Sequence, residues 1–256
     1  MNIIAIIPAR YKSHRLHGKL LKKLGTLNDT SSKTVIEYVY DNVKNTNLFK
    51  KVIVATDDER IREKIRKSGG YSVMTSSHHQ SGTDRIAEVA RQIDCEIIVN
   101  VQGDEPFINK TSLEKLISAF TDKDVDIATL GAYFNNDEEI ENPNSVKIVL
   151  DKDNYALYFS RAKIPYDREN SNFNSIKSQV SNIYIKHIGV YGFRRDILLK
   201  LVKLPMSQLE RIEKLEQLRW LENGYKIKVV ITEYNGISID TEHDLRQARM
   251  IVSHQS

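Results

Sequence analysis

The sequence predicts an α/β protein with a doubly wound, mostly parallel sheet and a smaller antiparallel insertion in its second half. Short apolar runs of strand length alternate with amphipathic helical patterns in the first half, which favours parallel strands with helices on both faces. The second half differs, because its first three β-type runs follow one another without a helical pattern between them. Hydrophobic residues make up 40% of the 256 residues, which is enough for a large core.

In the first half, strands and helices are expected in regular alternation. The strands are expected at Asn2–Ile7, Lys51–Ala55, Ser72–Met74, Ile97–Val101 and Asp126–Tyr133. The helices are expected at Thr34–Lys44, Asp58–Lys67, Gly82–Gln92 and Lys110–Phe120. Gly69 and Gly70 follow the second helix, where glycine readily supplies a left-handed terminating residue.

In the second half, strands are expected at Val146–Leu150, Tyr155–Phe159, Tyr184–Phe193 and Lys226–Thr232. Leucine and isoleucine recur at helical spacing over Gln208–Glu222 and predict one helix there; a terminal helix should start at Thr241 or Glu242. The polar stretch Asp167–Asn182 is expected to be a mobile loop. We predict one continuous domain over residues 1–256, with an insertion at about 155–210.

The composition fits an enzyme acting on small anions. A net charge of +4 is too small to indicate a nucleic-acid partner. The only cysteine, Cys95, cannot form an internal disulfide, which favours a reducing compartment. The N-terminal apolar run is too short for a signal peptide, and no segment approaches the ~18 apolar residues of a membrane span. A cytoplasmic protein without membrane partners is expected.

A loop rich in cations follows the first apolar run. After Ile3–Ile7 and Pro8, the chain carries Arg10, Lys12, Arg15 and Lys19, with Gly18 just before the last of these. A buried strand that ends in such a loop is typical of polyphosphate binding in open α/β sheets. The spacing is not that of a Walker motif. A solvated basic turn is the alternative interpretation.

Two aspartates follow β-type runs far apart in the sequence. In Ile97–Pro106, Asp104 comes after a buried strand and Gly103, at the sheet edge that faces ligands. A carboxylate there could bind Mg²⁺, or it could cap the helix after Pro106. Asp240 alone is better explained as a helix N-cap, but together with Asp104 it could complete a metal site.

Weaker signals come from polar segments elsewhere. The segment His78–Arg85 offers hydroxyl and backbone groups to a base edge, or it could be a turn and a helix cap. In the second half, Arg161 and His187 could hold a carboxylate and hydroxyls, and Glu216 could face a polar ligand. Each of these residues alone is more often structural.

Together these segments resemble the sugar-acid cytidylyltransferases, in particular those acting on 3-deoxy-manno-octulosonate (Kdo). The resemblance runs nearly end to end through IIPARYKSHRLHGK, VATDDERI, HQSGTDRIAEV, IVNVQGDEP, NPNSVKIVLD, YALYFSRAKIPYDR, KHIGVYGFRRD, LEQLRWLENGYKIKV and IDTEHDL. It implies a nucleotide-diphospho-sugar transferase fold and a Mg²⁺-dependent transfer of CMP from CTP to Kdo, with release of pyrophosphate, for lipopolysaccharide synthesis. It also implies a homodimer that pairs through the second half.

The resemblance also implies roles for individual residues. The CTP site would comprise Ala9, Arg10, Arg15, Lys19, Ser81, Gly82 and Gln102. The sugar acid would contact Gln102, Arg161, His187, Glu216 and Asp240. Asp104 and Asp240 would bind Mg²⁺, and together with Lys19 they would form the catalytic group.

The chain departs from the family pattern in the basic loop. Family loops read RLPGKPL, whereas this chain reads RLHGKLL, with His17 and Leu20 in place of both prolines. Since proline restricts φ, this loop is expected to be less rigid or to be held by other contacts. The alternatives are a cytidylyltransferase for 8-amino-Kdo or a sialic-acid-like sugar, and a nucleotide-binding regulatory protein without turnover.

Overall fold

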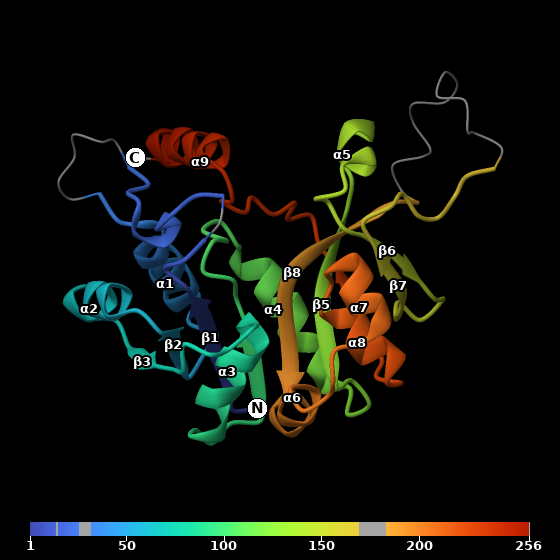
Figure 1. The fold of residues 1–256 in the computed structure, drawn as a ribbon, viewed down its shortest axis with the longest axis horizontal. Helices are drawn as coiled ribbons and strands as arrows, with labels where there is room; N and C mark the ends of the chain where they lie inside the picture. The colour runs from blue at the N-terminus through green and yellow to red at the C-terminus, as the bar shows by residue number, and fades with distance from the viewer. Residues whose placement is uncertain (14, 26–31, 169–182, 256) are drawn as a thin grey trace. The chain divides into compact units, whose positions relative to one another are not determined.

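The computed structural model describes residues 1–13, 15–25, 32–168 and 183–255. These residues form two compact units (Figure 1). The first unit comprises Met1–Leu113, Phe193–Val202 and Gly236–Ser256. The second comprises Glu114–Gly192 and Lys203–Asn235. No helix of the described residues is long and apolar enough to cross a bilayer.

The first unit contains a parallel sheet in the order β3-β2-β1-β4. Its strands are β1 (Ile3–Ala9), β2 (Lys51–Thr56), β3 (Ser72–Met74) and β4 (Ile97–Asn100). Its helices are η1 (Lys19–Leu21), α1 (Val35–Asn45), α2 (Glu59–Lys67), α3 (Gly82–Arg91), α6 (Arg195–Leu201) and α9 (Glu242–Gln255). Helix α4 (Lys110–Ser118) begins in this unit.

The strand order makes this unit doubly wound. The chain moves outward from β1 to β3 and then returns to the other side of β1 as β4. Because parallel crossovers are right-handed, α1 and α2 cover one face of the sheet and α3 covers the other. The order in which strands are added to the sheet reverses between β1 and β4. In such sheets, ligands bind at the carboxyl ends of the strands beside this point.

Strand β1 extends further than the sequence predicts. It passes through Pro8 to Ala9 and is buried along its whole length. Its pairing with β2 continues to Ala9, whereas its pairing with β4 ends at Ile6 and Asn100. Proline is tolerated here because β4 no longer requires a backbone donor at that point.

The second unit combines parallel and antiparallel strands. β5 (Ile127–Tyr133) lies parallel to β9 (Ile227–Ile231) and also beside β8 (Ile185–Arg194). β6 (Lys147–Leu150) is antiparallel to both β7 (Ala156–Ser160) and β8. The helices are η2 (Ala119–Thr121), α5 (Asp137–Glu141), α7 (Gln208–Glu213) and α8 (Gln217–Glu222). These pairings confirm the mixed, mostly parallel α/β class and the antiparallel character of the second half.

The single helix predicted over Gln208–Glu222 is wrong. Lys214 has φ 55° and interrupts the helix, so this segment forms two short helices, α7 and α8, instead of one. Leu218 is fully buried, but Ile212 is 69% exposed, so the apolar residues do not form one continuous stripe. The sequence interpretation also missed α5 and α6. Most of the predicted mobile loop Asp167–Asn182 lies outside the described residues.

Candidate active site at the carboxyl ends of β1 and β4

The loop after β1 and the turn after β4 meet beside the point where the strand order reverses. Lys19 begins η1, and Asp104 follows β4 by four residues. A Cβ on Gly103 would lie 3.0 Å from the Pro8 carbonyl oxygen, so only glycine lets this turn approach β1 so closely. The close approach brings the Asp104 carboxylate to the basic loop.

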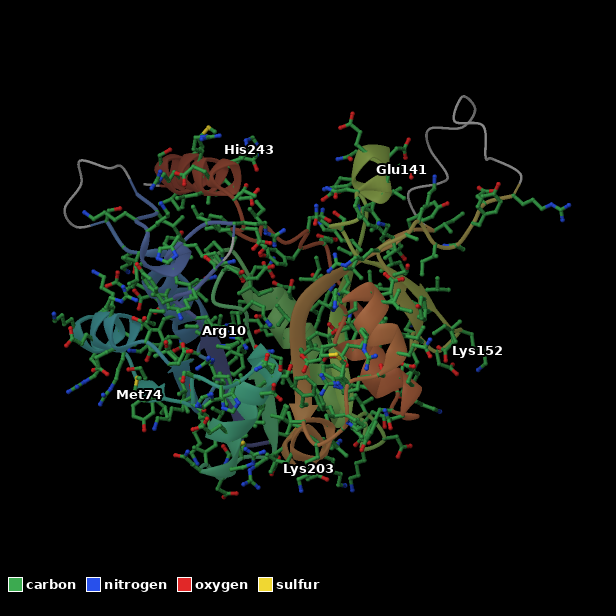
Figure 2. All side chains as sticks on the ribbon, viewed as in Figure 1. Arg10, Met74, Glu141, Lys152, Lys203 and His243 are labelled. Carbon is green, nitrogen blue, oxygen red and sulfur yellow. The ribbon has the colours of Figure 1, made fainter. Side chains whose placement is uncertain are left out.

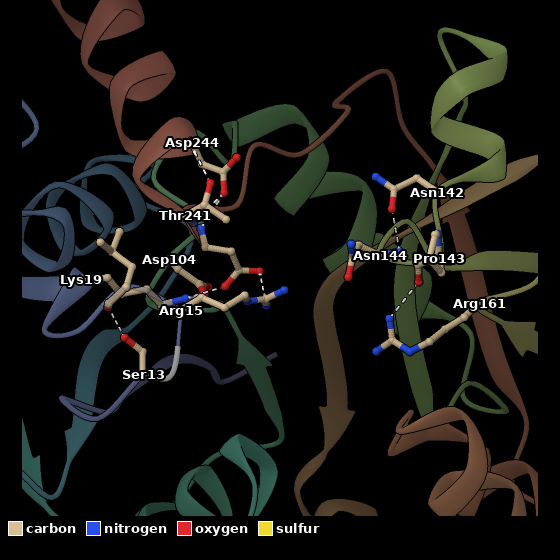
Figure 3. A network of polar contacts seen from close by, with 12 residues as sticks. Ser13, Arg15, Lys19, Asp104, Asn142, Pro143, Asn144, Arg161, Thr241 and Asp244 are labelled. Atoms are coloured by element: carbon tan, nitrogen blue, oxygen red, sulfur yellow. Dashed lines mark hydrogen bonds and ion pairs between the residues drawn. The ribbon is translucent and has the colours of Figure 1, made fainter.

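Three segments distant in sequence converge on one ammonium group (Figure 3). Lys19 Nζ lies 2.5 Å from Asp104 Oδ2 and 2.9 Å from Asp240 Oδ1. Arg15 Nη2 lies 2.8 Å from Asp240 Oδ2. The backbone joins the acidic segments as well, because Ile239 N donates to Asp104 O at 2.9 Å. Both carboxylates therefore lie within reach of one cation.

Neither aspartate acts as the helix cap that was its alternative interpretation. At the start of α9, Thr241 Oγ1 accepts from Asp244 N at 3.2 Å, while the Asp240 carboxylate faces Lys19. Before α4, Asn109 Oδ1 accepts from Ser112 N at 2.8 Å. Since other residues cap the helices, the two aspartates remain available for ligand chemistry.

Lys19 remains protonated in this setting. Desolvation disfavours its charged form, but the charges and hydrogen bonds of Asp104 and Asp240 outweigh that effect and raise its pKa. The side chain of Lys19 is only 12% exposed, against 22% for Asp104 and 37% for Asp240. The ion pairs are therefore stronger than those of an exposed surface pair.

The donor set fits a magnesium ion bound together with phosphate. Within the described ranges, no group of three or more His, Cys, Asp or Glu side chains could hold a metal by itself. Magnesium usually takes one or two protein carboxylates and completes its shell with phosphate oxygens and water. Asp104 and Asp240 match that requirement.

The basic loop is held by aromatic contacts in place of the missing prolines. His17 packs edge-on against Tyr11, with ring centroids 5.0 Å apart. The guanidinium of Arg60 lies 3.3 Å from the centroid of the same Tyr11 ring, and Asp58 fixes Arg60 through contacts of 2.9 and 2.6 Å. Gly18 has φ 63°, a conformation that glycine adopts without strain. No sequence pattern predicts this arrangement, which supplies contacts that hold the loop in the absence of both prolines.

The predicted base-binding segment lies beside the same strand. A Cβ on Gly82 would lie 3.3 Å from Pro8 Cγ and 3.9 Å from Gln102 Oε1, so Gly82 lies between β1 and the β4 turn. Ser81 caps α3 in a capping box with Asp84, as the alternative interpretation expected. Arg10 directly follows β1 (Figure 2) and donates to the His79 carbonyl at 3.1 Å. The basic loop and the segment before α3 are thus in direct contact.

Two residues of α3 that the sequence did not single out support this segment. Arg85 is fully buried, donates to Thr75 Oγ1 at 2.5 Å and lies 3.0 Å from the Asp57 carboxylate. Glu88 accepts from Ser76 N at 3.0 Å and contacts His79 Nε2 at 2.5 Å. Although burial opposes it, these hydrogen bonds lower the pKa of Glu88. The sequence alone does not identify Arg85 as a supporting residue, because its role depends on the burial of its position on α3.

The remaining predicted sugar residues lie in the second unit. Arg161 follows β7 and donates to the carbonyls of Glu213 and Pro143 at 2.7 and 2.9 Å. His187 packs between Phe159 and Tyr191, with ring centroids 5.2 and 5.3 Å away. Desolvation lowers the pKa of His187 to about 3, so its imidazole is neutral. Glu216 immediately precedes α8. Burial raises the pKa of Tyr191, and the charge of Glu216 raises it further.

Comparison with known proteins identifies the family. A family model described as cytidylyltransferase matches residues 4–227. A Flavobacterium johnsoniae protein named 3-deoxy-manno-octulosonate cytidylyltransferase is 46% identical over 98% of this chain and 99% of that protein. The chain belongs to the 3-deoxy-manno-octulosonate cytidylyltransferase family. This confirms the resemblance found in the sequence.

Further matches agree with that family. A Fusobacterium nucleatum protein of the same name is 47% identical over 96% of this chain and 95% of its own length. The solved structure of CMP:2-keto-3-deoxy-manno-octonic acid synthetase in complex with CTP covers all of both chains at 35% identity, with a TM-score of 0.89. An Anaerococcus prevotii 4-diphosphocytidyl-2C-methyl-D-erythritol synthase shares only the fold, with 16% identity over 98% of each chain and a TM-score of 0.61.

Proposed function

We propose that this protein transfers CMP from CTP to the anomeric hydroxyl of Kdo, giving CMP-Kdo and pyrophosphate. The observation that carries the proposal is the convergence of Lys19, Asp104 and Asp240 at the reversal point of the sheet. Family membership supplies the substrate class, since the relatives matched over nearly the whole chain are named for this sugar acid. The product would serve lipopolysaccharide synthesis.

The first unit would bind CTP. Arg10, Arg15 and Lys19 would hold phosphate oxygens, beside the backbone at Ala9, because a triphosphate needs several cations before another anion can approach it. Ser81 and Gly82 would bind the cytosine, with Gln102 beside them. The contact between Arg10 and the His79 carbonyl supports one continuous site for phosphates and base.

Asp104 and Asp240 would hold Mg²⁺ with the phosphates. The ion would supply charge neutralisation and alignment of the reacting groups. The oxygen of the sugar hydroxyl would form the new bond to the α-phosphorus and release its proton to water, while the bond from that phosphorus to the leaving pyrophosphate breaks in line. Lys19 would stabilise the charge that develops on the phosphates as this bond breaks. Positioning and electrostatics then account for most of the catalysis.

Arg161, His187 and Glu216 of the second unit would bind the sugar acid. His187 carries no charge at neutral pH, so it is suited to a hydroxyl group and not to the sugar carboxylate. Arg161 is the cation suited to a carboxylate, because a guanidinium forms strong charge-assisted hydrogen bonds to carboxylate oxygens.

Pyrophosphate release and product analysis with a panel of sugar acids test the proposal. With CTP and Mg²⁺, Kdo should support turnover at least about tenfold faster than 8-amino-Kdo or a sialic acid. Faster turnover with either alternative would transfer the proposal to that sugar. No turnover with any acid, together with tight CTP binding, would favour a regulatory protein.

Two further properties are part of this proposal. A cytoplasmic homodimer that pairs through the second unit is expected from the family pattern. Sedimentation equilibrium of the purified protein should give twice the 29.5 kDa mass of one chain. A monomer at micromolar concentration that is fully active would refute the dimer.

A further inference from the structure

Lys147, the first residue of β6, is fully buried although it carries a charged side chain. Its ammonium donates to the backbone carbonyls of Asn142, Ser145 and Arg161 at 2.9, 2.7 and 2.7 Å. An ammonium has three donors, so this set satisfies it completely. Among the described residues, no carboxylate forms an ion pair with it. Burying an unpaired charge is costly, so a lysine at this position needs a specific reason.

Each of the three acceptor carbonyls belongs either to Arg161 or to the loop that Arg161 contacts. The Arg161 carbonyl is held directly by Lys147. The Asn142 and Ser145 carbonyls lie on either side of Pro143, whose own carbonyl accepts from Arg161 Nη1 at 2.9 Å (Figure 3). Lys147 therefore fixes both the backbone of Arg161 and the loop that its guanidinium contacts.

Glu213 fixes Arg161 from the other side. Its carboxylate accepts from Arg161 N at 3.0 Å and from Ser160 Oγ at 2.6 Å, and its carbonyl accepts from Arg161 Nε at 2.7 Å. In the described part of the chain no residue hydrogen-bonds to Nη2 of Arg161. Nε and Nη1 of the guanidinium are thus committed to the protein. The position of the remaining nitrogen, Nη2, depends on the loop that Lys147 holds.

We propose that Lys147 is a positioning residue for the sugar acid, acting through Arg161 and the Asn142–Ser145 loop. The inference rests on the proposed role of Arg161 in holding the sugar carboxylate. A lysine is suited to this task because a compact ammonium can satisfy three carbonyls from different directions. The residue determines where the carboxylate binds without touching the substrate.

Steady-state kinetics of Lys147→Met test the inference, because methionine keeps most of the stem volume and removes the ammonium. The KM for Kdo should rise at least about tenfold, while the KM for CTP stays within twofold. Lys152→Met, at an 88% exposed lysine of the same unit, is the matched control and should change neither value. Equal rises in both KM values would indicate a merely structural lysine and would overturn the inference.

A double-mutant cycle with Arg161→Ala separates the two levels of the argument. If Lys147 acts through Arg161, Lys147→Met should raise the KM for Kdo by less than twofold in the Arg161→Ala background. Additive effects would overturn the inference and leave the proposed function intact. An unchanged KM for Kdo in Arg161→Ala alone would instead refute the role of Arg161 in the proposed function.

Lys147→Arg covers the case in which the methionine variant does not fold. Arginine keeps the charge, but its planar guanidinium does not match the three carbonyl directions. The same selective rise in the KM for Kdo is then expected, at about threefold or more. Wild-type KM values for Kdo and CTP in a folded Lys147→Arg variant would overturn the inference.

Discussion

Removing the Lys19 ammonium tests the centre of the proposed site. In Lys19→Met the side chain keeps most of its apolar stem, but Asp104 loses its 2.5 Å partner. Asp240 keeps Arg15 at 2.8 Å. Breaking one partner of a buried ion pair costs roughly 3–5 kcal/mol, and these carboxylates are partly exposed, so a loss of about 1–3 kcal/mol in unfolding free energy is expected. Turnover should fall by ~10²–10³, the effect of losing one preorganised electrostatic contact in a transition state.

A second readout separates this site from a simple loss of stability. Without CTP, the wild-type Lys19 ammonium competes with a divalent ion for the oxygens of Asp104 and Asp240. Lys19→Met should therefore bind Mg²⁺ at least about tenfold more tightly, which is ~1.4 kcal/mol. Isothermal titration or the Mg²⁺-dependent rise in Tm measures this change.

Lys22→Met is the matched control, because Lys22 is one turn away and pairs with Glu242 at 3.6 Å on the surface. It should leave turnover and Mg²⁺ affinity unchanged. Turnover of Lys19→Met within threefold of wild type would refute the catalytic role of Lys19. Unchanged Mg²⁺ affinity would show that the two carboxylates are not the metal ligands.

Three further predictions concern the metal site, the neutral histidine and the basic loop. Asp104→Asn should lower kcat by ~10²–10³ while the Kd for CTP changes less than tenfold, and normal turnover of the folded variant at saturating Mg²⁺ would contradict the metal role. The unfolded chain protonates His187 near pH 6.5 but the folded imidazole only near pH 3, so this residue should remove roughly 2 kcal/mol of stability as the pH falls from 6.5 to 5. Denaturant titrations at several pH values should show this loss in wild type and not in His187→Gln. The same dependence of unfolding free energy on pH in both proteins would refute the prediction. Tyr11→Leu should raise the KM for CTP about two- to tenfold, because an aromatic pair contributes ~0.5–1.5 kcal/mol. Adding His17→Pro to this variant should recover part of the lost affinity. An unchanged KM for CTP in Tyr11→Leu would show that the Tyr11–His17 contact does not hold the loop.

The site's location could be predicted because it depends on local patterns and one topological rule. A buried run followed by cations, and a second followed by Gly103 and Asp104, place these groups at the same edge of a parallel sheet. Asp240 could not be assigned from its own segment, where helix capping was the better explanation. Only the tertiary contact with Lys19 shows that its carboxylate faces the basic loop.

The errors occurred where long-range contacts override local periodicity. Leucine spacing predicted one helix over Gln208–Glu222, but Lys214 adopts a left-handed conformation directly after Glu213. Glu213 uses its carbonyl and carboxylate to hold Arg161, fifty-two residues away in sequence. No pattern within the helix encodes that partner, so the break was not predictable.

The candidate site contains both cations and carboxylates, and the pairing between them has a consequence for ligand selectivity. Arg15 and Lys19 neutralise Asp104 and Asp240 within one cluster, so the carboxylates are stable without a divalent ion. A triphosphate alone would gain the two cations but leave the two carboxylates unpaired beside its own negative charges. A triphosphate that brings a divalent ion satisfies all four groups at once. If the proposed function is right, the cluster would therefore favour the metal complex of the nucleotide over the bare nucleotide, a selectivity that a purely basic loop would not have.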